Sequence, residues 1–348
     1  MQFYNKIHPF YCGIDLHVKS LYVCIINDKG EKILHKSIKA SPDELLELLM
    51  PYIGKVVIGA ECMHCWYWVA DLCRNNNIEF ILGHALYMKS IHGGKAKNDK
   101  IDSFKIVTLM RGGTFPLAYV YPEVMRATRD LLRRRSNCVY YRAQLKAHVK
   151  NTASQYNLTH PPVNLRSEQD RILIRDSFNQ LDESVQVNIG LDLNLVKRMD
   201  QELYQIESFI EKQAKQHNPC DYDLLRTIPG VGKIIALTII YEVGHIERFS
   251  SVQRFASYSL LIKCKAESAG KSYGTRGNKK GNIHLKRVFS QMTALYLSNS
   301  PQAKQYLQSL QKRMSKPKAL AVLSHKIGRC VYKILKDKST FNEALLLK

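Results

Sequence analysis

The chain has 348 residues, 45% of them hydrophobic, and a formal net charge of +22. This length allows two domains and a connector, each domain with a packed core, and the charge favours a polyanionic partner such as nucleic acid. The longest apolar runs, such as residues 234–241, are far too short to span a bilayer, which excludes a membrane-spanning protein.

The first third of the chain has the pattern of an α/β domain. Residues 11–15, 21–27 and 32–38 alternate apolar and polar side chains, which predicts a three-stranded antiparallel meander. Ser41 and Pro42 are typical of a helix start. A strand over 55–60, a helix over 66–75 and a strand over 78–82 are expected to follow. This order of elements predicts an RNase H-like fold.

Four carboxylates dominate this region. Asp15 ends the apolar run 10–15, and Glu61 ends the run 56–61, so each is expected at the rim of a sheet. Asp99 and Asp102 are three residues apart and share a face if their segment is helical. Clustered carboxylates indicate a bound cation, and oxygen ligands suit Mg²⁺, the usual metal of phosphodiester chemistry. The alternative is four unrelated surface acids at the ends of elements.

Two histidines accompany these acids. His17 and His64 each lie within three residues of one of the four carboxylates. The sequence favours a surface imidazole for both, with a supporting or proton-handling role beside the acids as the alternative.

Residues 122–156 predict one long helix with a heavy basic load. Only Glu123 and Asp130 offset its cations, whereas a solvated charged face normally mixes both signs. We therefore predict a surface that contacts a nucleic-acid backbone. Its cations are Arg126, Arg129, Arg133, Arg134, Arg135, Arg142, Lys146 and Lys150.

A connector and a short coiled-coil pattern come next. Residues 157–185 are polar and contain two adjacent prolines, as is typical of a linker. An apolar seam with alternating spacings of three and four residues follows, and it could pack within the chain or pair two protomers. The seam consists of Val196, Met199, Leu203, Ile206 and Ile210.

The last third begins with a helix-hairpin-helix pattern. Two helical segments, 222–227 and 233–243, are joined by Pro-Gly-Val-Gly. Gly230, Gly232 and Lys233 are expected to contact a phosphate there, because glycines permit close approach and the second helix offers free N–H groups. A tight turn between packed helices is the alternative. Ser250 is expected to cap a further helix that ends at residue 258.

Residues 267–282 predict a flexible cationic loop. Such a loop could be a disordered tether, a phosphate cradle or the carrier of a serine nucleophile. Helices are expected over 284–299 and 317–338. The loop residues expected to contact nucleic acid are Lys271, Arg276, Lys279 and Lys280.

The order of these motifs resembles that of the DEDD insertion-sequence transposases, a family that includes the Piv-type DNA invertase. The N-terminal match is Gly-Ile-Asp at Asp15, then Glu61, then Asn-Asp-Lys-Ile-Asp at residues 98–102. The second half is similar in its Ile-Pro-Gly-Val-Gly hairpin, a Ser-x-Gly loop at Ser268, a Lys-Lys-Gly-Asn element at 279–282 and a basic final helix.

The resemblance implies a RuvC-like domain over 1–156, a linker and coiled coil over 157–217, and a mostly α-helical C-terminal transposase domain over 218–348. The four acids would hold Mg²⁺, and Ser268 would attack a DNA phosphodiester to form a covalent phosphoserine. The implied partners are donor and target DNA, a structured guide RNA encoded by the element, and further copies of the chain in a dimer or tetramer. The expected location is the cytoplasm, at the nucleoid, in agreement with nine scattered cysteines and no visible N-terminal signal.

The sequence departs from the family before the serine loop. The usual Gly-Leu-x-Pro run is replaced by Ser-Leu-Leu-Ile at 259–262, which leaves Ser272 as a second candidate nucleophile. Three other functions remain open: a Holliday-junction resolvase-like nuclease, a site-specific DNA invertase, and a non-catalytic nucleic-acid-binding protein on a decayed scaffold.

Overall fold

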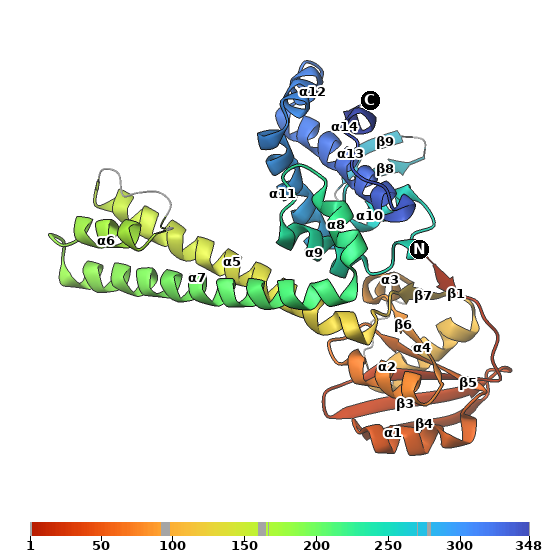
Figure 1. Cartoon of the computed structure of the whole chain (residues 1–348). Helices are drawn as coiled ribbons and strands as arrows, with labels where there is room; N and C mark the ends of the chain where they lie inside the picture. Colours follow the sequence, from red (N-terminus) through yellow and green to blue (C-terminus); the bar gives the residue numbers. More distant parts are fainter. Residues whose placement is uncertain are drawn as a thin grey trace. The chain divides into compact units, whose positions relative to one another are not determined.

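The computed structural model describes residues 2–91, 98–158, 165, 167–269, 271–276 and 280–347. The chain forms two compact units, Met1–Glu123 and Val124–Lys348, shown as ribbons in Figure 1. The first unit is mixed α/β and the second is mostly helical, so the predicted class of α/β plus α is confirmed. Among the described residues no helix combines the length and apolar character that a membrane span requires.

A mixed sheet organises the first unit. Its order among the described residues is β1-β7-β6-β5-β2-β3-β4. The predicted antiparallel meander β2-β3-β4 is confirmed, and β2, β5 and β6 are parallel. The edge strand β1 and its neighbour β7 were not predicted. The strands are β1 (Phe3–Tyr4), β2 (Phe10–Leu16), β3 (Ser20–Asn27), β4 (Lys32–Lys39), β5 (Val56–Glu61), β6 (Glu79–Gly83) and β7 (Phe115–Ala118).

Helices cover both faces of this sheet. Alternation along β2 sends Ile14 into the core formed with α1 and α2, and Tyr11 into the core formed with α4. Asp15 has the parity of Tyr11 and therefore lies on the face that α4 covers. The helices of the unit are α1 (Pro42–Leu49), α2 (Trp66–Asn75), α3 (Ala85–Ile91) and α4 (Asp99–Arg111).

The second unit is built from helices and one hairpin of strands. Its largest core includes Met125 and Leu132 of α5, Ile210 of α7 and most of the buried side chains of α9, α11 and α13. The helices are α5 (Glu123–Gln155), α6 (Glu168–Ser177), α7 (Glu183–His217), α8 (Pro219–Arg226), α9 (Lys233–Val243), α10 (Val252–Tyr258), α11 (Ile283–Asn299), α12 (Pro301–Gln311), α13 (Lys316–Asp337) and α14 (Glu343–Leu347); the strands are β8 (Cys264–Ser268) and β9 (Lys271–Arg276).

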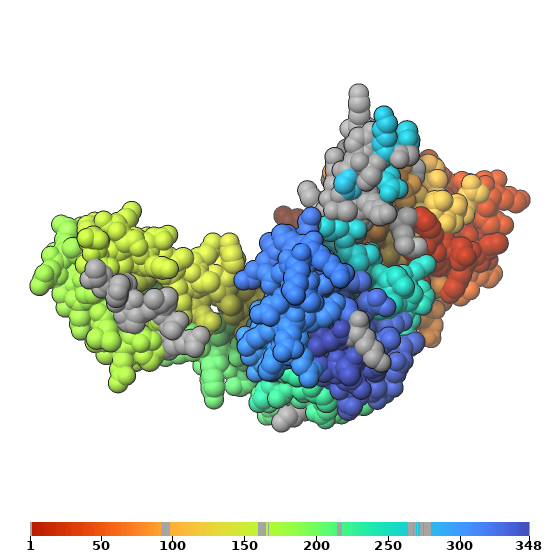
Figure 2. Space-filling model, turned by 90° about the horizontal axis from the view of Figure 1, so that it is seen from above, coloured from red at the N-terminus to blue at the C-terminus, as the bar shows by residue number. Residues whose placement is uncertain are grey.

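The coiled-coil seam packs within the chain. Val196, Leu203 and Ile210 of α7 are buried. Successive ion pairs, Arg135 to Glu207 and His148 to Asp192, show that α7 runs antiparallel to α5. Figure 2 shows the far ends of these helices, with α6, as an arm extending from the rest of the unit.

Part of the predicted linker is helical. α6 begins after Ser167, whose hydroxyl accepts from the Asp170 N–H in a capping box. Ile174 and Phe178 are buried against α5 and α7, and this apolar contact stabilises a helix that a polar segment alone does not indicate.

The compact units do not divide the chain at residue 156. Because Met125 and Leu132 lie in the core of the second unit, α5 packs with the C-terminal helices. The three-domain division at 156 and 217 stays a prediction. Two smaller differences are that α10 is capped by Ser251 rather than Ser250, and that α12 was not predicted.

Candidate active site

Two of the predicted acids lie on neighbouring parallel strands. Ile14 of β2 pairs with Ala60 of β5, so the next residues, Asp15 and Glu61, come side by side where these strands end. The Asp15 side chain is only 15% exposed. The apolar runs that precede both residues fill the interior of the sheet, and this burial places the carboxylates at its rim.

The other two acids lie on the first turn of α4. The helix begins at Asp99, and the Asn98 side chain caps it by accepting from the Lys100 N–H at 2.9 Å. Asp102 follows one turn later, so the predicted shared face is confirmed. Acidic side chains are favourable at a helix N-terminus because of the helix dipole.

A glycine lets α4 come close to β2. A Cβ atom at Gly13 would lie 2.6 Å from the carbonyl oxygen of Ser103 and 2.8 Å from Cγ1 of Val107. No larger residue fits without moving the helix. Gly13 therefore sets the depth at which α4 packs and, with it, the distance from Asp99 to Asp15.

His17 joins the two pairs of acids. Its Nε2 is 3.3 Å from Oδ2 of Asp15 and 3.4 Å from Oδ1 of Asp99. Ligand atoms of these three residues all lie within 4.8 Å of one another. The ring is half exposed, as the surface interpretation predicted, yet it contacts both carboxylates.

The electrostatics of this cluster disfavour charge on Asp15. Burial raises the pKa of the Asp15 carboxyl, and the negative charges of Asp99 and Asp102 raise it further, against a lowering by His17. Lys105, 3.1 Å from Asp102, offsets part of the charge. Converging carboxylates fit a divalent cation, because its charge would offset their repulsion and its preferred ligands are oxygens.

The predicted serine loop contains a strand hairpin. In the hairpin, Ser268 of β8 pairs with Lys271 of β9, and Glu267 of β8 pairs with Ser272 of β9. The two candidate serines therefore lie on opposite strands, in neighbouring pairs of the ladder. Lys271 is exposed, and Lys280 is half-buried beyond the hairpin. The side chains of Ser268, Ser272 and Arg276, and all of Lys279, lie outside the described residues.

A polar cluster at the base of this hairpin segment joins the residues that precede it to those that follow it. Asn282 caps α11, and its Nδ2 donates to Glu242 at 2.8 Å and to the hydroxyl of Tyr258 at 3.2 Å. The Asn282 N–H also donates to the Tyr258 carbonyl at 2.6 Å. Gly281 leaves room, since a Cβ there would lie 2.7 Å from that carbonyl. The segment that carries Ser268 therefore leaves and rejoins the helical core at one point.

Two arginines near the start of α5 donate hydrogen bonds to Glu242 of this same cluster. Arg129 and Arg133 donate to Glu242 at 3.1 Å and 2.5 Å, and these bonds offset the effect of burial so that the pKa of Glu242 is lowered. Arg126 is buried as well. The burial of Arg126 and Arg129 disfavours a surface role for these two, whereas the Arg133 side chain is 32% exposed. Nucleic-acid contact by these three arginines stays a prediction. Arg134 and Lys150 are exposed.

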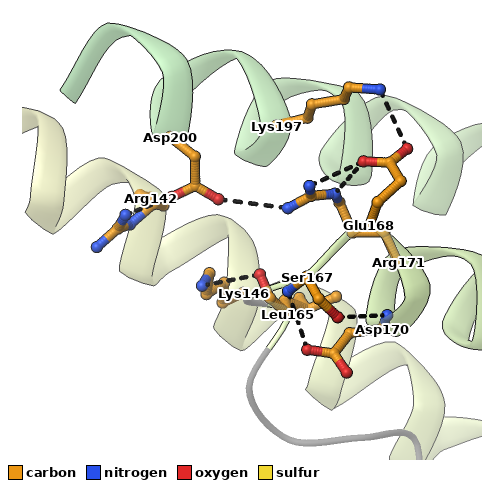
Figure 3. Close-up of polar contacts among 9 residues, drawn as sticks. All are labelled: Arg142, Lys146, Leu165, Ser167, Glu168, Asp170, Arg171, Lys197 and Asp200. Carbon is orange, nitrogen blue, oxygen red and sulfur yellow. Dashed lines mark hydrogen bonds and ion pairs between the residues drawn. The ribbon is translucent and has the colours of Figure 1, made fainter. Parts of the chain in front are cut away.

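Further along α5, the cations contact α7 and the residues that precede α6. Figure 3 shows Arg142 beside Asp200 of α7, whose other oxygen is 3.4 Å from Arg171 of α6. Lys146 donates to the carbonyl of Leu165 at 3.3 Å. The acids that offset the charge of α5 thus come from α7 and α9, so the sign imbalance within its own sequence overstates its cationic surface.

The glycine-rich turn between α8 and α9 is tightly packed. Gly230 has a φ of +82°, and a Cβ there would lie 2.8 Å from the carbonyl carbon of Leu295. Gly232 and Lys233 line a cavity of about 370 Å³ with Glu207 and Glu211, and Lys233 lies 2.5 Å from Glu211. A phosphate here would meet two carboxylates, so the geometry favours a packing role for Gly230, and phosphate contact by this turn stays a prediction.

Two residues in or near these clusters, Glu242 and His35, were not predicted from the sequence. Glu242 is the one acid in α9, a mostly apolar helix, and an isolated acid of this kind in a chain with an arginine-rich helix is the signal that indicates a buried ion pair. His35 of β4 contacts α4 and carried no sequence signal, because its partners lie far along the chain.

Comparison with known proteins gives matches to both halves of the chain. Residues 12–158 match a family profile described as Transposase, of the DEDD type of IS110 elements. Residues 222–308 match the profile Transposase IS116/IS110/IS902 family. The transposase for insertion sequence element IS1111A of Coxiella burnetii (strain RSA 493 / Nine Mile phase I) is 22% identical over 338 residues, which cover 94% of this chain and 90% of that protein.

Proposed function

Because the chain belongs to the DEDD insertion-sequence transposases of the IS110/IS116 family, we propose that it cuts and rejoins DNA with a Mg²⁺-binding carboxylate site and a serine nucleophile. The observation that carries the proposal is the convergence of Asp15, His17 and Asp99 at the rim of the sheet, with Glu61 and Asp102 adjacent. The strand order, an antiparallel meander followed by parallel strands, supports an RNase H-like, RuvC-like fold for this unit.

The four acids are held in two pairs by different elements of the chain. Asp15 and Glu61 are held by paired strands, and Asp99 and Asp102 by the first turn of α4. Together they would hold Mg²⁺, which supplies Lewis-acid chemistry at the scissile phosphate and offsets its charge. His17 holds Asp15 and Asp99 toward each other through Nε2.

Ser268 would provide the nucleophile. Its oxygen forms a bond to phosphorus, the serine proton passes to a nearby base, and the deoxyribose oxygen leaves and takes up a proton. Rejoining reverses these steps with a different deoxyribose hydroxyl, so the bond energy is kept in the phosphoserine and no ATP is needed. The proposal includes a dimer or tetramer in which serine and carboxylates act on one phosphodiester.

The partners of this reaction are donor and target DNA, with a structured guide RNA encoded by the element. The strong positive charge of the chain favours such polyanions. A reaction on cellular DNA would take place at the nucleoid, in the cytoplasm. A resolvase-like nuclease would use the same carboxylates on water, and an invertase would share all of the site chemistry.

The function is tested by joining assays with purified protein, the element's RNA and DNA carrying both element ends. We expect joined products in Mg²⁺ and Mn²⁺, none in EDTA, and recovery when metal is added back. Joining that proceeds equally well in EDTA would reject the metal site. Hydrolysed ends that are never joined would favour the nuclease.

The α5 cations give a prediction about binding. We expect Arg134→Ala or Lys150→Ala to weaken nucleic-acid binding uniformly across sequences and to reduce the slope of log affinity against log salt by about one. Arg142→Ala should change the slope less, because Asp200 already offsets that charge. Arg129→Ala should instead destabilise the fold by roughly 3–5 kcal/mol, since it leaves Glu242 buried without one of its partners.

Fluorescence anisotropy over a series of salt concentrations measures these slopes, and thermal unfolding measures the stability. The exposed Gln144→Ala on the same helix is the control for both. Slopes for Arg134→Ala and Lys150→Ala equal to the parent's would exclude α5 as a contact surface.

A further inference from the structure

One imidazole connects β4 to the helix that carries two of the acids. Nε2 of His35 is 3.0 Å from the carbonyl oxygen of Lys100 and 3.2 Å from Oγ of Ser103. A carbonyl only accepts, so Nε2 carries the proton and donates. Lys100 lies between Asp99 and Asp102, and His35 therefore bonds the backbone of the turn that carries both carboxylates.

The packing around His35 fixes its ring. The ring of Tyr22 on β3 meets it edge-on at 5.2 Å between centroids, and Phe104 of α4 lies at 6.3 Å. The Lys32 ammonium lies 4.0 Å above the Phe104 ring. Burial lowers the pKa of His35, and the charges of Lys32 and Lys100 act in the same direction, against a raising by the hydrogen bond to the Lys100 carbonyl. The lowered pKa favours the neutral imidazole, whose N–H lies on Nε2, the atom that faces this carbonyl.

Gly13 and His35 hold α4 at two separate strands. Gly13 on β2 sets how deeply the helix packs, by its close contact with Ser103. His35 lies on β4, two strands away, at a distance of about 10 Å across the sheet. The later turns of α4 pack against the sheet through buried apolar side chains, whereas residues 99–101 at its start are exposed. The bond from His35 to the Lys100 carbonyl therefore ties this exposed start of the helix to β4 and restrains it from swinging away from the strands.

We propose that His35 is a positioning residue of the carboxylate site, which orients the first turn of α4 so that Asp99 and Asp102 face Asp15. The proposal rests on the proposed function, because it assumes that these carboxylates bind a divalent cation together. His35 itself touches neither the cation nor the DNA in this role.

The test is a titration of the full chain with Mn²⁺, in which electron paramagnetic resonance counts the free ion. Mn²⁺ accepts the oxygen ligands that suit Mg²⁺. His35→Leu removes the donor and should weaken Mn²⁺ binding by about 10–100-fold, the usual effect of losing a group that orients a ligand. His35→Gln places an amide N–H near the position of Nε2 and should bind Mn²⁺ nearly as the parent does. Lys36→Gln, exposed on the same strand, is the matched control.

The outcomes separate the two proposals. Unchanged Mn²⁺ affinity in His35→Leu, with binding lost in Asp15→Asn, overturns the role of His35 alone. Equal binding by the parent and Asp15→Asn overturns the metal site and the role of His35 together. If His35→Leu does not fold, His35→Asn replaces it, because its shorter amide does not reach Lys100; equal affinities of the Asn and Gln variants would then refute the proposal.

Discussion

Replacing Asp15 by asparagine is expected to abolish strand cleavage without destabilising the protein. Loss of a direct metal ligand should lower the cleavage rate by more than about a hundredfold, which is the upper end of the effect of losing a group that supports a ligand. The folded-state pKa of Asp15 is raised by burial and by Asp99 and Asp102, so its ionised form disfavours the folded state at pH values above that pKa. Asparagine has the same shape and no charge. In EDTA at neutral pH its melting temperature should equal or exceed that of the parent.

Cleavage assays in Mg²⁺, anisotropy for nucleic-acid binding and thermal unfolding in EDTA measure these three properties. Asp28→Asn makes the same chemical change on an exposed carboxyl in the turn between β3 and β4, and it should leave all three unchanged. Cleavage at the parent's rate by Asp15→Asn would reject the catalytic role. Loss of binding together with unfolding would show that Asp15 is structural.

The second large effect is expected at the serine hairpin. With the element's RNA, a suicide DNA substrate and Mg²⁺, the parent should form a protein–DNA adduct that survives a denaturing gel. Ser268→Ala lacks the attacking oxygen and should form none, while Ser272→Ala should form the adduct as the parent does. Ser272 is a matched control, because it lies on the facing strand of the same hairpin.

The pattern of adducts decides between mechanisms. Nicked DNA without an adduct, unaffected by Ser268→Ala, would assign the chain to the nucleases that activate water. An adduct lost only in Ser272→Ala would identify Ser272 of β9 as the nucleophile instead of Ser268. Ser268→Ala should retain the Mn²⁺ affinity that Asp15→Asn loses, and this difference distinguishes loss of the nucleophile from loss of the metal.

Much of the first unit follows from local sequence. The alternation along β2 to β4 predicted the meander, and the apolar runs before Asp15 and Glu61 predicted two acids at a sheet rim. The spacing of Asp99 and Asp102 predicted that both lie on one face of a helix, and α4 has them there. These features depend on side chains within a few positions of one another, so periodicity and capping reveal them.

The partners of the basic helix α5 could not be predicted from local sequence. Its cations look unbalanced within α5 because their partners are remote: Glu207 lies 72 residues from Arg135, and Glu242 lies 113 residues from Arg129. Only packing against α7 and α9 brings these acids to the arginines. The same packing buries the seam of α7 within the chain, a choice that its spacing left open.

The sequence by itself determined the strands of the first unit, the four acids of the candidate site and the order of motifs that indicated the family. The tertiary structure decided which side chains stand beside those acids and which cations face inward. His17 and His35 carry no periodic signal, and each owes its place to the depth and rotation of α4 against the sheet. That geometry is set by contacts such as Gly13 with Ser103, which form only when distant segments pack together.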